Sequence, residues 1–152
     1  MAFKIKSTLQ AVESYLLASG YFGSNVAVGE PKQPVAGAEL SAAIFMGSTT
    51  VAETTLTKII EQHMVTIRIY RDMLAEPTES IEFELGEVSS DIQSDLIGDY
   101  DLGETIRNID IAGIYGAGMG ATWGYVDLGG KMYRIVDISL PLIVDDSATM
   151  AA

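Results

Sequence analysis

The chain has 152 residues, 48% of them hydrophobic and 20% charged, with a formal net charge of −12 and no cysteine. This composition predicts a single globular domain over residues 1–152, and the missing cysteines exclude disulfides, thiolate metal sites and cysteine nucleophiles. The acidic balance argues against binding of nucleic acid or of an anionic membrane, since both need basic residues. No apolar run reaches the length of a spanning helix or forms a signal peptide, so no membrane partner is expected.

The first elements expected are a helix and a short strand. Apolar side chains at i, i+4, i+7 and i+11 predict a helix over residues 3–19, which Gly20 ends. A short strand is expected at residues 25–28. Proline and glycine in residues 30–37 indicate an extended connection to the next element.

The middle of the chain predicts strands followed by a second helix. Apolar alternation predicts strands over residues 40–47 and 62–71, while residues 48–57 fit either a loop or an arm of a long hairpin. An apolar stripe with Pro77 in its first turn predicts a helix over residues 78–97. A further strand is expected at residues 106–115.

The last stretch, Trp123 to Asp146, predicts a β-hairpin. Gly129-Gly130 separates two apolar runs, and glycine supplies the positive φ angles that a two-residue turn requires. Residues before and after the turn alternate at period two. Pro141 lacks an N–H, so we expect an edge strand or an end of strand pairing there. Residues 147–152 are expected to form a flexible tail.

These elements together predict an α+β fold. The strands are grouped rather than alternating with the two helices, so a mostly antiparallel sheet with both helices packed on one face is expected.

Two loops could hold a ligand. Residues 116–120 read GAGMG, which is similar to a phosphate-binding loop but has the spacing G-x-G-x-G and precedes a strand instead of a helix. A small-ligand or nucleotide site in this Gly116–Gly120 loop is one alternative, and a mobile hairpin connection is the other. Carboxylates at residues 95–104 could bind a cation, but they lack the EF-hand spacing, so a solvated acidic loop is favoured.

No set of residues predicts catalysis. His63 is the only histidine and has only Glu61 and Gln62 as polar neighbours in the sequence, so a structural or exposed histidine is favoured. Nucleophile-elbow and zinc-protease motifs are absent. We therefore expect no enzyme activity, no catalytic residues, no bound metal and no organic cofactor.

Three arginines are candidate interface residues because cations are scarce in this chain. Arg68, Arg71 and Arg134 could meet carboxylates of a neighbouring subunit, or they could pair within the chain. The acidic and glycine-rich loops supply the other candidates for subunit or partner contact: Asp99, Asp101, Glu104, Gly116, Gly118 and Met119.

The chain resembles the tail terminator or tail-completion proteins of the neck of tailed bacteriophages. Besides the N-terminal helix, the segments that carry the resemblance are NVAVGEP at residues 25–31, HMVTIRIYR at 63–71, LIGDYDLGETIRNIDIAGIYG at 96–116 and GYVDLGGKMYRIVDISLPLIVDD at 124–146. They span most of the chain, and none of them is a catalytic motif.

The resemblance implies a structural virion protein. Such a protein would be assembled in the host cytoplasm and would form a homo-oligomeric ring, commonly a hexamer, at the head-proximal end of the tail. Its partners would be the tail tube protein and the head–tail connector or neck proteins. DNA would pass through the ring without specific binding, and an acidic lumen would repel it.

Overall fold

The computed structural model describes residues 5–29, 40–54, 58–73, 77–98, 108–114 and 116–147. Within these residues the fold is α+β, as the sequence predicts. The elements in chain order are α1 (Ile5–Ser19), β1 (Val26–Val28), β2 (Ser41–Thr54), β3 (Lys58–Asp72), α2 (Thr78–Gly98), β4 (Asn108–Ile109), β5 (Gly120–Leu128) and β6 (Lys131–Ser147). Neither of the described helices is long and apolar enough to cross a membrane.

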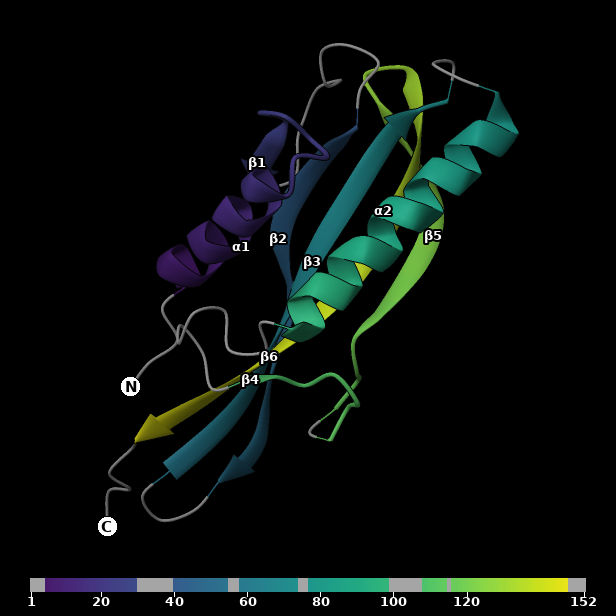
Figure 1. The fold of residues 1–152 in the computed structure, drawn as a ribbon. Helices are drawn as coiled ribbons and strands as arrows, with labels where there is room; N and C mark the ends of the chain where they lie inside the picture. The colour runs from purple at the N-terminus through teal and green to yellow at the C-terminus, as the bar shows by residue number, and fades with distance from the viewer. Residues whose placement is uncertain are drawn as a thin grey trace.

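The described strands form one sheet in the order β1-β2-β3-β6-β4, and β5 also pairs with β6. β1 runs parallel to β2, and every other pairing is antiparallel. Both helices lie on the same face of the sheet (Figure 1). The ends of β2, β3 and β6 extend beyond the helices as a three-stranded arm (Figure 1).

The predicted hairpin is confirmed. Gly129 and Gly130 have φ angles of 61° and 87°, which glycine adopts without a steric penalty. The Gly130 amide donates a hydrogen bond of 2.8 Å to Oδ1 of Asp127, and Leu128 pairs with Lys131 across the turn. Local sequence signals therefore determine both the turn and the register of β5 against β6.

Pro141 lies at a change of strand partner. β6 pairs with β3 through Pro141 without interruption, so β6 is not an edge strand here, but its pairing on the other side is interrupted, as the second alternative expected. On the opposite side, the partner of β6 changes from β5, which reaches Ser139, to β4, which starts opposite Ile143 and Leu142. Pro141, which has no backbone N–H, therefore lies between these two partners of β6. Its carbonyl accepts a hydrogen bond of 2.8 Å from the Asp110 amide.

The main core lies between the helices and the sheet. Alternate residues of β3 and β6 point toward the helices, and the apolar stripes of α1 and α2 pack on them. The core residues include Leu9, Val12 and Leu16 of α1, Ile81, Leu85, Val88, Ile92 and Leu96 of α2, Val65, Ile67 and Ile69 of β3, and Val136, Ile138, Leu140 and Leu142 of β6. A smaller cluster of Ala43, Tyr70, Leu128, Tyr133 and Ile135 lies on the other face.

Two strand predictions change. Residues 48–54 belong to β2, so the long-hairpin alternative is correct for them. The strand expected at residues 106–115 is limited, among its described residues, to Asn108–Ile109. Oδ1 of Asp110 accepts the Ile114 amide at 2.8 Å, and this side-chain bond replaces strand pairing with a turn. Most of the expected tail, residues 148–152, lies outside the described residues.

Candidate functional site

The three candidate arginines each have a carboxylate partner in the same chain. Their side chains are only 10–17% exposed. Each of them stands on β3 or β6 and reaches a neighbouring strand or α2. The alternative of pairing within the chain is therefore present in the structure, and a direct role in subunit contact stays a prediction.

Arg68 and Asp137 face each other across β3 and β6 on the sheet face away from the helices. Nε and Nη2 of Arg68 donate to the two carboxylate oxygens of Asp137 at 2.7 and 3.0 Å. The guanidinium also lies 5.1 Å from the ring centroid of Phe45. The hydrogen bonds to Asp137 raise the pKa of Arg68, although burial opposes this. The pair thus links β3 to β6 on this face.

Arg134 joins β6 to α2 and to the aromatic side chains of β5. Its Nε donates to Oε1 of Glu82 at 2.6 Å, which raises the pKa of the guanidinium. The guanidinium carbon lies 4.4 Å from the ring centroid of Tyr125 and 5.3 Å from that of Trp123. Arg71 likewise reaches α2, with Nε 3.1 Å from Oε1 of Glu84. Arg134 and Arg71 thus link the sheet to α2 instead of projecting into solvent.

The glycine-rich loop is compact. Nε2 of Gln62 donates to Oδ2 of Asp110 and to the Ala117 carbonyl, both at 3.1 Å, and the Met119 amide donates to the Ile111 carbonyl. A Cβ atom at Gly118 would lie 2.8 Å from the Ile111 carbonyl oxygen. Glycine is required at this position by close contact within the loop.

The same requirement applies to the other glycines of this loop. A Cβ atom at Gly116 would lie 2.5 Å from Oε1 of Gln62, and one at Gly113 would lie 2.7 Å from the Gly116 carbonyl oxygen. Packing thus accounts for their small size, and the mobility expected from the sequence stays a prediction. The chain continues from this loop into β5, so the loop does not lead into the N-terminus of a helix.

His63 of β3 is buried. Its Nδ1 lies 3.3 Å from Oγ1 of Thr49, and its Nε2 lies 3.7 Å from Oε1 of Glu61. Burial lowers the pKa of His63, and the Glu61 carboxylate opposes this shift. The described residues contain no cluster of three histidine or acidic side chains that could hold a metal. Of the acidic candidates, Asp99, Asp101 and Glu104 lie outside the described residues.

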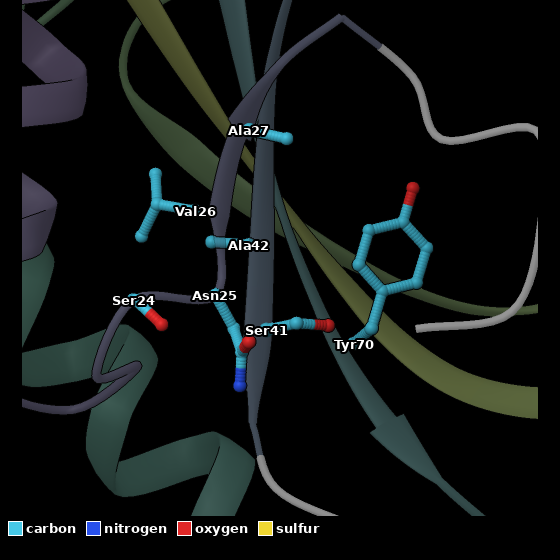
Figure 2. A pocket seen from close by; sticks show the side chains of 7 residues that line it. All are labelled: Ser24, Asn25, Val26, Ala27, Ser41, Ala42 and Tyr70. Carbon is cyan, nitrogen blue, oxygen red and sulfur yellow. The ribbon is translucent and has the colours of Figure 1, made fainter. Parts of the chain in front are cut away.

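A hollow of about 180 Å³ lies beside β1 and β2. The described residues that line it are Ser24, Asn25, Val26, Ala27, Ser41, Ala42 and Tyr70. The Ser41 hydroxyl is buried, has no hydrogen-bond partner among the described residues and points toward the Tyr70 side chain (Figure 2). None of these lining side chains is charged, so they suit an uncharged group better than a phosphate.

Comparisons with known proteins assign no family to this chain. No known family model matches the chain, and no curated protein sequence matches it significantly.

The outer edge of β5 is an open strand edge that carries exposed aromatic side chains. Among the described strands, β5 pairs only with β6. Trp123 and Tyr125 project from β5 toward the helix face and remain 37% and 59% exposed. The opposite edge of the sheet consists of β1 and the part of β2 beyond Ile44. Unpaired strand edges are binding surfaces, since their N–H and C=O groups can pair with another chain.

The β5 edge was missed as a candidate site from the sequence. The signal was available, because residues 111–126 contain no charged side chain in a strongly acidic protein. A charge-free segment that ends in an exposed aromatic strand indicates a contact surface.

Proposed function

We propose that this chain is a structural virion protein that forms a homo-oligomeric ring at the head-proximal end of a phage tail tube. The ring would terminate the tube and join it to the connector of the head, and DNA would pass through its centre. The observation that carries the proposal is the sheet, which is left open at two opposite edges among the described residues.

Two different open edges support a ring more than a two-fold dimer. When different surfaces of one subunit meet, each subunit contacts two neighbours, and the assembly closes if the rotation between subunits allows it. A two-fold dimer instead uses the same surface twice. An open sheet with different edges therefore fits a cyclic assembly of identical subunits.

The net charge of −12 sets a condition on such a ring. Identical acidic subunits repel each other, so their contacts should be poor in charge. Both the β5 edge and the β1 edge meet this condition. An acidic ring would also repel the DNA that passes through it, which favours passage over binding.

The alternative of a nucleotide site in the Gly116–Gly120 loop gains no support from the geometry. Gly116 and Gly118 are in close contact with Gln62 and with the loop backbone. The loop leads into a strand, so it lacks the helix dipole that stabilises a bound phosphate.

Sedimentation velocity and native mass spectrometry of the purified chain over a range of concentrations test the proposal. We expect a single closed multiple of the subunit mass, either free in solution or only when tail tubes are present. A chain that stays monomeric at all concentrations and also fails to bind tube ends would overturn the proposal.

A proline at the β5 edge gives a variant for the same measurement. The Gly129-Gly130 turn makes Leu128 and Lys131 a hydrogen-bonded pair, so the N–H groups of Leu128 and of every second residue before it point toward β6. The N–H groups of the residues between them, including Ala121, point away from β6. Ala121→Pro removes an outward donor and leaves the bonds to β6 in place. We expect weaker assembly with unchanged stability, whereas Gln10→Ala on the exposed side of α1 should alter neither.

A further inference from the structure

Two charge-free segments form the opposite edges of the sheet. Residues 21–29 contain no Asp, Glu, Lys or Arg, and they include β1. Residues 111–126 are equally free of charge, and they include most of β5. In a protein with a net charge of −12, these are edges at which two copies can meet without direct contact between like charges.

The two edges lie at the same level of the sheet. Strand registers place Ala27 opposite Ala43, Ala43 opposite Arg68, Arg68 opposite Asp137, and Asp137 opposite Thr122. This row crosses the whole sheet from β1 to β5. A second copy placed beside the first in the same orientation would bring Ala27 next to Thr122 with no shift along the strands.

The strand directions are compatible with pairing. β1 is parallel to β2, and the neighbours β2, β3, β6 and β5 alternate in direction, so β5 runs opposite to β1. Two copies in the same orientation would therefore form an antiparallel pair between β5 of one and β1 of the next. Antiparallel pairing gives the straighter and slightly more stable hydrogen bonds.

The rest of the β1–β2 edge is less suited to pairing. Beyond Ile44, β2 has irregularities at Gly47 and Ala52, where its register against β3 shifts, and it carries Glu53. Bulges and charged residues protect strand edges from pairing with other chains. The β5 edge contains neither, apart from Asp127 at the hairpin end.

Apolar side chains would be covered on the helix side of this seam. Val26 lies in the same cross-strand row as Trp123, and Val28 projects from the same face of β1. Val28 is 45% exposed and Trp123 is 37% exposed. The seam would place Val26 directly opposite Trp123 and Val28 opposite Ala121, with Val28 diagonal to Trp123. Removing this apolar surface from water stabilises the contact.

We propose that the outer edge of β5 pairs antiparallel with the outer edge of β1 in a second copy of this chain, so that one sheet continues into the next. The inference rests on the proposed ring and specifies the contact within it. β1 has only three residues, so each seam has few hydrogen bonds. Single contacts are therefore weak, and closure of the ring provides the stability.

Paired cysteines test the seam without interference, because the chain has none of its own. In the Ala27→Cys/Thr122→Cys variant the two thiols meet across the seam on the same face. Mild oxidation should give a reducible covalent ladder that ends at the ring size. In the Ala27→Cys/Ala121→Cys control the thiols lie on opposite faces, since successive strand residues alternate, and no ladder should form. Each single variant should stop at a dimer or below.

The outcomes separate the seam from the ring. If wild type is oligomeric but Ala27→Cys/Thr122→Cys gives no ladder, the seam is wrong and the ring stands. A ladder from Thr50→Cys/Thr122→Cys instead would assign the contact to the outer part of β2 and overturn the seam. Equal ladders from the matched and control pairs would show unspecific collision and overturn it as well. A chain that never assembles and does not bind tube ends overturns both.

Discussion

At the scale of single residues, the Arg68–Asp137 pair is a bidentate ion pair on the sheet face away from the helices. We expect Arg68→Met to lower the free energy of unfolding by about 1.5–3 kcal/mol, because Asp137 loses two charge-assisted hydrogen bonds in a partly buried site. Urea denaturation of wild type and variant measures the change.

The matched control for this pair is the double variant Arg68→Met/Asp137→Val. Replacing both members by apolar residues removes the unpaired carboxylate, so most of the lost stability should return. If the double variant is less stable than Arg68→Met, Asp137 is held by other contacts and the pair matters less than its geometry indicates.

His63 should make stability depend on pH. Its pKa in the fold is lowered from the ordinary value of 6.5 by burial, so below that value the unfolded chain binds a proton more readily than the folded chain. The free energy of unfolding should therefore fall as the pH decreases from about 8 to about 5. In His63→Gln this decrease should be smaller, while the contributions of the carboxylates remain. Equal pH profiles for the two proteins would contradict the assignment.

The arginines illustrate what the sequence can predict at this scale. Their scarcity identified Arg68, Arg71 and Arg134 as important, but not their partners. Asp137 lies 69 positions after Arg68, and Glu82 lies 52 positions before Arg134. Only the sheet register and the placement of α2 bring these groups together. Charge reversal at Arg68 or Arg71 would therefore disturb folding before it reported on an interface.

At the scale of elements, the loop before β5 depends on small residues. Gly118→Ala places a Cβ atom 2.8 Å from the Ile111 carbonyl oxygen and 3.1 Å from other backbone atoms, so the loop must move. We expect a loss of about 1–3 kcal/mol in the free energy of unfolding. Gly120→Ala is the control, since no atom lies within 4 Å of its Cβ position, and it should change stability by less than about 0.5 kcal/mol. Similar losses in both variants would mean that strand propensity, not packing, explains the glycines.

Predictions of elements succeeded where the determining signals are local. The Gly129-Gly130 turn, the alternation in β6 and the apolar stripe of α2 are all contained in short segments. The strand expected at residues 106–115 failed in its described part because one side chain, Asp110, bonds to the Ile114 amide and to Gln62 of β3. The parallel pairing of β1 could not be predicted, since it depends on tertiary contact and not on a turn.

At the scale of the whole molecule, charge and topology lead to the same conclusion. An acidic chain keeps two charge-free strand edges on opposite sides of one sheet, at the same level and in opposite directions. Evolution usually blunts such edges in proteins that stay monomeric. The α+β fold class could be predicted from the sequence. That the two edges lie in the same cross-strand rows could be recognised only from the strand registers of the structure.

Electron microscopy of purified tail tubes incubated with this chain tests the central claim most directly. The account predicts a closed ring at one end of each tube, with a central opening, and loss of that ring with Ala121→Pro. Tubes whose ends both remain bare, at concentrations that saturate any specific site, would contradict it.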